Sequence, residues 1–202
     1  MAEIRAADVK ALRERTGAGM MDCKAALVEA GGAIDKAVEV LRVRGQAQAA
    51  KRSGRSTGEG IVASYIHATG KVGAMVELQC ETDFVARNDE LREFARDIAL
   101  HIAAASPTVV SAEQIDPATI EAERRIHRDK ALEDGKPDAI VEKIVDGQIV
   151  KWQKDTVLLQ QPHVNLAKHD GKTIDELRAA MSAKTGENLR IARFARFVVG
   201  EE

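Results

Sequence analysis

Two cysteines and five histidines are the residues of this chain that could bind a metal ion or act as nucleophiles. Metal sites usually repeat such ligands at short spacings, and the sequence contains neither an HExxH pattern nor a CxxC pair. His101 lies among Ala and Ile residues, which favours a structural histidine. Cys23 and Cys80 each fall on an apolar face, which favours buried thiols over a thiol enzyme. We therefore expect no metal ion and no cofactor.

Two glycine-containing segments resemble nucleotide-binding motifs without satisfying them. Residues 171–173, Gly-Lys-Thr, are like the end of a phosphate-binding loop, but Leu166 occupies the position of the first glycine that such a loop requires. Residues 58–63 imitate a dinucleotide fingerprint, yet they precede an expected strand, whereas the fingerprint must follow one. No GxSxG elbow occurs. Without a catalytic signature, we expect a protein that is not an enzyme.

One polar connection, at residues 80–88, contains two apolar side chains, Phe84 and Val85. One interpretation is that Asp83 caps the following helix while Phe84 packs back onto the core as a staple. The other is that a rigid turn presents the Phe84 ring to a partner, as interface anchors do. The spacing of the residues favours the first interpretation and leaves the second open.

The composition narrows the classes of protein that could position these residues. The 202 residues are 45% hydrophobic, enough for a packed core, and 30 basic against 32 acidic residues give a net charge of −2. That balance argues against a dedicated nucleic-acid binder. Aromatic residues make up only 3% of the chain, which argues against a base-stacking surface. No apolar stretch approaches the roughly 20 residues that span a bilayer, and the start lacks a signal peptide. We expect a soluble, cytoplasmic protein.

Residues 1–52 are expected to form a small three-helix module. Apolar residues recur there at helical spacing in three segments, which end at glycines 17, 31 and 45, and residues 46–51 can extend the last helix. A polar linker follows. The chain between Glu39 and Glu59 contains no acidic residue and five basic ones, Arg42, Arg44, Lys51, Arg52 and Arg55, here called the basic segment. A solvated linker is its favoured interpretation, and a surface that follows nucleic-acid phosphates is the alternative.

Residues 53–202 are expected to form an α+β core domain with an antiparallel three-stranded sheet. Residues 61–67 and 72–80 predict a β-hairpin, and residues 189–199 predict a third strand beside it. Between about 88 and 105, apolar residues recur at i, i+3, i+4 and i+7, which predicts a helix that covers one face of the sheet. Two further helices, separated by a break at 133–137, predict a helical hairpin at about 116–153.

Two stretches carry a resemblance to a known family: residues 12–24, followed by Ala26 and Leu27, and residues 80–85. In this order and separation they make the chain similar to bacterial elongation factor Ts, the nucleotide exchange factor for elongation factor Tu. Matches at 135–137, 142–144 and 161–162 extend the resemblance over essentially the whole chain. The chain has room for one core half, so it resembles the short members of the family.

The resemblance implies a fold and a mode of action. In this family the three N-terminal helices form a ubiquitin-associated-like module, and the short members form homodimers in which a second copy supplies the missing core half. The family's Thr-Asp-Phe-Val turn enters the nucleotide domain of elongation factor Tu, disturbs the Mg²⁺ and phosphate site and promotes GDP release. The matching residues are Thr82, Asp83, Phe84 and Val85 in this turn, and Lys10, Arg13, Met20 and Met21 for a contact by the N-terminal module.

The implied partners are elongation factor Tu and a second copy of the chain, with no direct contact to nucleic acid and none to a membrane. The chain departs from the family at His163, which stands where Phe often follows Gln-Pro. An alternative function is an adaptor or scaffold whose helical module binds peptide or ubiquitin-like partners, because a three-helix fold alone does not determine function.

Overall fold

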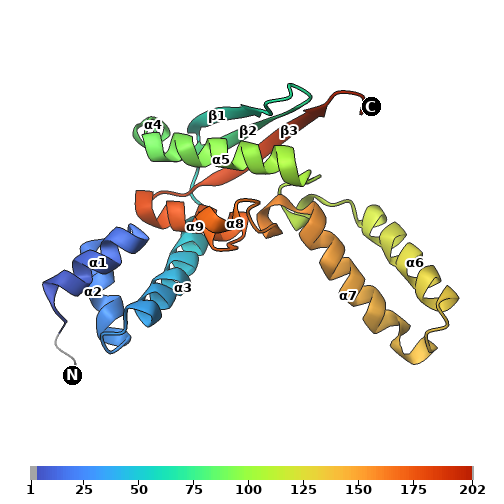
Figure 1. Ribbon diagram of the computed structural model, residues 1–202, viewed down its shortest axis with the longest axis horizontal. Coiled ribbons are helices and arrows are strands. Elements are labelled where there is room, and N and C mark those ends of the chain that lie inside the picture. Colours follow the sequence, from blue (N-terminus) through green and yellow to red (C-terminus); the bar gives the residue numbers. More distant parts are fainter. Residues whose placement is uncertain (1–3, 202) are drawn as a thin grey trace. The chain divides into compact units, whose positions relative to one another are not determined.

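The structure, a computed structural model, describes residues 4–201. Helices and one three-stranded sheet form an α+β fold with helices at its N-terminal end, as predicted (Figure 1). No helix in this described range is long and apolar enough to cross a membrane. The helices are α1 (Ala6–Thr16), α2 (Met20–Glu29), α3 (Ile34–Arg52), α4 (Asp83–Ala86), α5 (Asp89–Ala105), α6 (Pro117–Glu133), α7 (Asp138–Thr156), α8 (Leu166–His169) and α9 (Ile174–Thr185). The strands are β1 (Glu59–Ile66), β2 (Val72–Cys80) and β3 (Arg190–Val198).

The chain divides into two compact units. Unit 1 contains the residues up to Ile61, Leu78–Glu93 and Glu176–Ile191. Unit 2 contains Val62–Glu77, Phe94–Asp175 and the residues from Ala192 onward. Unit 1 thus joins the N-terminal helices to two segments from far along the chain. The division predicted after residue 52 stays a prediction.

Three helices form the N-terminal part of unit 1. Helix α1 ends at Gly17, whose φ of 68° is left-handed and whose N–H donates to the Arg13 carbonyl oxygen at 2.7 Å. The prediction that Gly45 ends the third helix is wrong, because α3 continues to Arg52. A glycine within a helix costs about 1 kcal/mol relative to alanine, and the good helix formers at 46–51 outweigh that cost. The buried core of these helices consists of Val9, Leu12, Cys23, Ala26, Leu27 and Ala37.

The sheet has the strand order β1-β2-β3, and its neighbouring strands are antiparallel. Where β1 turns into β2, the His67 N–H donates to the Val72 carbonyl oxygen at 2.8 Å. Where β3 ends, beside the beginning of β2, the Val199 N–H donates to the Lys71 carbonyl oxygen at 2.9 Å. The strand that comes last in the chain lies beside the hairpin, as the sequence predicts, and it pairs with β2.

Within unit 2, helix α5 lies along one face of the sheet (Figure 1). The side chains of Ala74 and Val76 in β2, and of Ile98 and Ile102 in α5, are buried between them. The Arg196 side chain of β3 also faces this helix, since its Nε donates to the Ala103 carbonyl oxygen at 3.2 Å. The apolar stripe that predicted a helix at about 88–105 thus packs on the alternating strand residues, which is how a helix and a sheet share one core.

The opposite face of the sheet in unit 2 is here called the outer sheet face. Alternation along the strands places on it the side chains of Glu77 and Arg193, which form an ion pair at 2.7 Å. Its large apolar side chains are all exposed: Val62, Ile66, Met75, Phe197 and Val199. Several exposed large apolar side chains on one face of a sheet indicate an interaction site.

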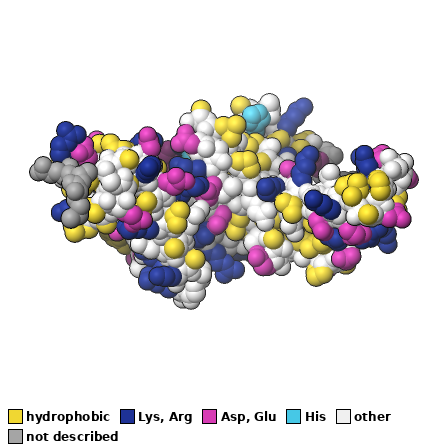
Figure 2. Space-filling view, turned by 90° about the horizontal axis from the view of Figure 1, so that it is seen from below, with side chains coloured by type: hydrophobic (Ala, Val, Ile, Leu, Met, Phe, Trp, Pro, Cys, Tyr) yellow, Lys and Arg dark blue, Asp and Glu magenta, His cyan; other side chains and the backbone are white. Residues whose placement is uncertain are grey.

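Helices α6 and α7 in unit 2 pack against each other as the predicted helical hairpin. Asp116 and Pro117 begin α6 as the sequence indicates, since Asp116 Oδ1 accepts the Ala118 N–H at 2.9 Å. The hairpin buries a small core of Ala131, Val141, Val145 and Ile149. On its surface, at the right of Figure 2, hydrophobic side chains lie among charged ones of both signs.

Candidate partner-binding site

The connection between β2 and α5 forms a helix of a single turn, α4, in unit 1. Thr82 is its N-cap residue, because the Thr82 hydroxyl oxygen accepts the Val85 N–H at 3.4 Å. The Phe84 side chain is 82% exposed, whereas Val85 and Ala86 are buried. The interpretation of Phe84 as a staple onto the core is therefore wrong: the helical turn directs the next two side chains inward and Phe84 outward.

Asp83 does not cap the helix either. Its carboxylate pairs with the Arg87 guanidinium at 2.9 Å, one helical turn later, and both side chains are exposed. Exposed pairs of this type contribute little to stability, so the pair mainly determines which charges surround the ring. The turn presents a bare aromatic ring beside one carboxylate and one guanidinium group.

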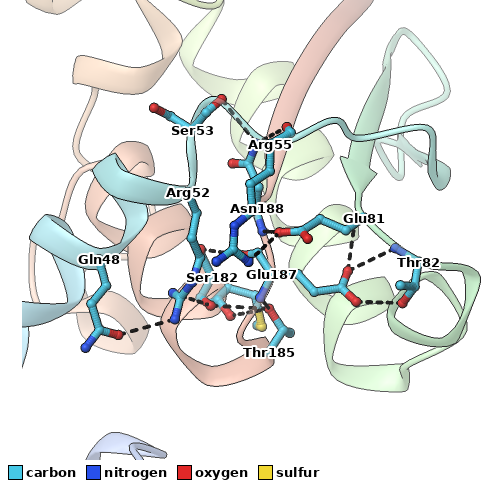
Figure 3. Close-up of polar contacts among 11 residues, drawn as sticks. Gln48, Arg52, Ser53, Arg55, Glu81, Thr82, Ser182, Thr185, Glu187 and Asn188 are labelled. Carbon is cyan, nitrogen blue, oxygen red and sulfur yellow. Dashed lines mark hydrogen bonds and ion pairs between the residues drawn. The ribbon is translucent and has the colours of Figure 1, made fainter.

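The turn is attached to the segment between α9 and β3, which lies more than 100 residues later in the chain. Glu187 Oε2 accepts the backbone N–H groups of Glu81 at 2.9 Å and of Thr82 at 3.1 Å. Glu187 Oε1 accepts the Thr82 hydroxyl at 2.6 Å. Figure 3 shows this carboxylate pointing at the residues that precede α4. One side chain therefore binds three donors at the entrance of the turn.

Asn188 holds the same region from the other side. Its backbone N–H donates to Glu81 Oε1 at 2.6 Å, and this bond, assisted by the Arg55 guanidinium, holds the pKa of Glu81 below its ordinary value. The Asn188 side-chain amide donates to the carbonyl oxygens of Arg55 at 2.9 Å and Ser53 at 3.3 Å (Figure 3). The residues after α3 are thereby connected to the turn. Glu187 and Asn188 are not predictable from the sequence, because no local spacing relates them to positions so far away.

The four predicted residues of the N-terminal module also lie in unit 1. Lys10 and Arg13 are exposed on α1, and Met20 and Met21 are exposed in the first turn of α2. Two exposed methionines in sequence are a polarizable, adaptable surface that suits protein contacts. The structure thus places all eight predicted contact residues in one compact unit, seven of them exposed and Val85 buried.

The basic segment is largely engaged within unit 1. The Arg42 guanidinium pairs with the Glu176 carboxylate at 2.9 Å, and the Arg44 guanidinium pairs with Glu29. Arg55 pairs with Glu81 at 3.3 Å. Charges that are neutralised by acidic neighbours attract phosphates weakly, so these pairs argue against the nucleic-acid interpretation of this segment.

Unit 2 contains a histidine cluster that the sequence analysis also missed. The ring centroids of His101 and His163 are 5.2 Å apart, and those of His163 and His169 are 4.2 Å apart. Burial lowers the pKa of His101 to about 4, and burial is also the main cause of the lowered pKa of His163 and of His169. These rings are therefore neutral at physiological pH.

The hydrogen bonds of this cluster indicate a structural role. The Val164 N–H donates to His101 Nδ1 at 3.2 Å, which leaves Nε2 of the neutral ring to donate to Gln161 Oε1 at 2.9 Å. His163 Nε2 likewise donates to the Asp97 carbonyl oxygen at 3.2 Å. These bonds tie residues 161–164 to α5. No group of three or more His, Cys, Asp or Glu side chains between residues 4 and 201 is arranged to hold a metal ion.

The two cysteines are buried free thiols, as predicted. The Cys80 thiol donates to the Thr82 carbonyl oxygen at 3.1 Å, and burial raises its pKa. A raised pKa leaves a thiol protonated and unreactive at neutral pH, which argues against Cys80 as a nucleophile.

Comparisons with known proteins show which family the chain resembles along its length. A sequence profile of the family described as Elongation factor TS matches residues 3–201. The chain is 52% identical over 199 residues, 98% of each chain, to elongation factor Ts of Nitratidesulfovibrio vulgaris. It is 50% identical over 202 residues, the full length of both chains, to that of Solidesulfovibrio magneticus. It is 53% identical over 198 residues, 98% of this chain and 90% of the relative, to that of Geotalea uraniireducens.

Proposed function

This chain belongs to the elongation factor Ts family, and from that premise we propose which of its surfaces act and how. The chain is a nucleotide exchange factor for elongation factor Tu in translation elongation: it promotes the release of GDP so that GTP can bind. Exchange of this kind changes the affinity of one protein for its nucleotide and involves no covalent chemistry by the exchange factor. The adaptor alternative is not favoured.

The exposed Phe84 ring is the observation that carries the proposed mechanism. An exposed aromatic ring on a turn that is tied down at its entrance can enter a pocket of a partner without losing much conformational entropy. In the proposed mechanism the turn Thr82–Val85 enters the nucleotide domain of elongation factor Tu, and Phe84 shifts the segments that hold Mg²⁺ and the GDP phosphates. Asp83 contributes polar contacts beside the ring, while the buried Val85 anchors the turn from below.

Lys10, Arg13, Met20 and Met21 are proposed to contact the same domain of elongation factor Tu. Their exposure on α1 and α2, and their presence in one compact unit with the turn, support a shared binding surface. The coupling is reciprocal: any loss of GDP affinity caused by this chain equals the loss of its own affinity caused by GDP. The complex is therefore tightest when elongation factor Tu is free of nucleotide.

A homodimer that packs through the outer sheet face is proposed as the functional assembly. Five large apolar side chains on this face are exposed in the single chain, and a second copy can cover them with an identical surface, as a two-fold interface requires. Glu77 and Arg193, which pair with each other on this face, can instead form ion pairs with the corresponding residues of the second copy. We also propose a cytoplasmic location, which suits the two free thiols and the function in translation.

The proposed mechanism is tested by the release of fluorescent GDP from elongation factor Tu, with and without this protein. Phe84→Ala should slow the release while its melting curve stays that of the wild type. The matched control is Leu166→Ala, which removes another exposed apolar side chain, from α8 in unit 2, and should leave the release rate unchanged. A Phe84→Ala protein that is stable and exchanges at the wild-type rate would contradict the proposal.

A further inference from the structure

We propose that Glu187, with Asn188 beside it, is a positioning residue for nucleotide exchange: its carboxylate holds the turn that presents Phe84. Glu187 and Asn188, together with their partners Glu81 and Thr82, are here called the 187–188 clasp. The inference rests on the proposed role of Phe84, and it adds a residue that lies outside the turn and outside the N-terminal module.

The turn cannot maintain its own geometry. Helix α4 has four residues, and a single helical turn is unstable alone because it orders several residues for one or two hydrogen bonds. Its N-cap bond, from the Val85 N–H to the Thr82 hydroxyl, is long at 3.4 Å. Contacts from elsewhere in the chain must therefore hold the turn.

Glu187 supplies these contacts at the two residues that directly precede α4, Glu81 and Thr82. Both of its oxygens are used, by the N–H groups of Glu81 and Thr82 and by the Thr82 hydroxyl at 2.6 Å. Hydrogen bonds to a carboxylate are about twice as strong as bonds between neutral groups. The bond to the hydroxyl also orients Thr82 so that its oxygen lone pairs face the Val85 N–H. Glu187 thus determines both the direction in which the chain enters α4 and the cap of that helix.

The clasp is itself fixed to a rigid element. Helix α9 ends at Gly186, whose φ of 76° is left-handed and whose N–H donates to the Ser182 carbonyl oxygen at 2.9 Å. The Ser182 hydroxyl donates to the Glu187 carbonyl oxygen at 2.5 Å, which holds the backbone of Glu187 against the end of the helix. Asn188 is almost completely buried and bonds both Glu81 and the residues after α3. Figure 3 shows the continuous set of bonds from this helix end to Thr82.

The chemistry of the clasp predicts which substitution loosens it. Glu187→Gln keeps the size of the side chain but removes its charge: the amide oxygen can accept the two N–H groups, whereas the NH₂ group can only donate to the Thr82 hydroxyl, so three charge-assisted bonds become weaker neutral ones. The turn should then sample other orientations, and the fraction of molecules that present Phe84 correctly falls. The apparent affinity for a partner falls by the same fraction.

The test is a double-mutant cycle on the rate of GDP release. Glu187→Gln should reduce the rate at sub-saturating protein about tenfold, which corresponds to ~1.4 kcal/mol of lost coupling. In a protein that already lacks the ring, Phe84→Ala, the same substitution should change the rate less than twofold, because there is no ring left to position. A purely structural role would instead reduce both backgrounds by the same factor. The matched control is Glu113→Gln, which removes the same charge in unit 2 and should exchange like the wild type.

Two further measurements distinguish a loss of positioning from unfolding and from a failure of the proposed role of Phe84. Thr82→Val, at an exposed position, removes the hydroxyl that donates to Glu187 and also caps α4, so it should slow release at least as much as Glu187→Gln, and Glu187→Gln should add little to it. Hydrogen exchange of the Thr82 amide should accelerate at least about tenfold in Glu187→Gln at an unchanged melting temperature. If Phe84→Ala slows release but Glu187→Gln does not, the clasp has no positioning role and the proposed function stands. If Phe84→Ala exchanges normally, the proposed role of the Phe84 ring itself fails.

Discussion

Phe84 and Phe197 are both strongly exposed, at 82% and 68%, in a chain that has only four phenylalanines, yet their surroundings differ. Phe84 stands alone on one helical turn beside the Asp83–Arg87 ion pair. Phe197 lies in a strand, in a row of exposed apolar side chains on the outer sheet face. A lone ring among charges suits insertion into a pocket, whereas a row of apolar side chains suits a flat, extended interface.

The two rings also differ in how they are held. Phe197 lies in a sheet whose strands bond along their length, so its position follows from regular hydrogen bonding. Phe84 depends on a carboxylate from a distant segment. Exposure alone therefore does not identify the kind of partner. The number of apolar neighbours, and the contacts that hold the ring in place, distinguish a side chain that can insert into a partner from one that can form part of a flat dimer interface.

Phe84→Ala is expected to have the largest effect on function. A hot-spot ring contributes about 2–4 kcal/mol, which corresponds to roughly 30- to 700-fold in the coupling between this chain and GDP. Because the ring makes little contact within the chain, the melting temperature should stay that of the wild type. Fluorescent GDP release and a melting curve on the same sample measure both quantities. A destabilisation of about 3–5 kcal/mol would instead indicate a core residue.

Lowering the pH should destabilise unit 2, which contains Phe197, because the histidine cluster resists protonation in the folded state. The pKa of folded His101 lies near 4 against 6.5 in an unfolded chain, so the unfolded chain binds the proton first as the pH falls. The stability from neutral His101 is therefore complete above pH 6.5 and is lost between pH 6.5 and about 4, on the order of 3 kcal/mol. Urea unfolding between pH 4 and 8 measures this loss.

Substitution within the cluster sharpens that expectation. His163→Phe removes one of the closely spaced rings whose burial resists protonation, so the loss of stability between pH 6.5 and 4 should become smaller. The matched control is His67→Gln, at an exposed position outside the cluster, which should keep the wild-type pH dependence. An unchanged pH profile in His163→Phe would mean that the cluster does not determine acid stability.

Phe197→Asp should dissociate the proposed homodimer. A charge in the middle of an apolar interface costs at least about 2 kcal/mol, so the dimer dissociation constant should rise 30-fold or more. Light scattering at micromolar concentration should report about twice 21.9 kDa for the wild type and 21.9 kDa for the variant. Phe84→Ala serves here as the control and should remain dimeric. A wild-type chain that is monomeric at this concentration would refute the dimer, and with it the contrast between the two rings.

The sequence predicts the elements of this fold well because their signals are local. The stripe at Leu91, Phe94 and Ile98 and the alternation of Ala74 and Val76 each report one buried face. The prediction fails where the determining partner is distant. Spacing alone favours a core position for Phe84, because nothing near it in the chain reveals that a later segment holds the turn.

The candidate site shows the same limit. Resemblance to a family predicts the turn and the N-terminal contact residues, but it points to no supporting residue. Glu187 is an ordinary glutamate in a polar turn until the fold brings it within 2.6 Å of the Thr82 hydroxyl. The sequence does not predict the histidine cluster either, since His101 and His163 come close only when residues 161–164 pack on α5.

Among the four substitutions, which are Phe84→Ala, His163→Phe, Phe197→Asp and Asp83→Ala, the last is expected to have the smallest effect. The Asp83–Arg87 pair is exposed and screened, so its loss should leave the melting temperature unchanged. Exchange should slow by about two- to tenfold, the range of a solvent-accessible polar contact of up to ~1.4 kcal/mol. Arg87→Ala distinguishes the two possible causes. If Asp83 acts by pairing with Arg87, both variants should slow GDP release equally, because each removes the same ion pair. If Asp83 contacts elongation factor Tu directly, Asp83→Ala alone should slow it, and Arg87→Ala should leave it at the wild-type rate. A wild-type rate in both variants would leave the ring as the only functional group of the turn.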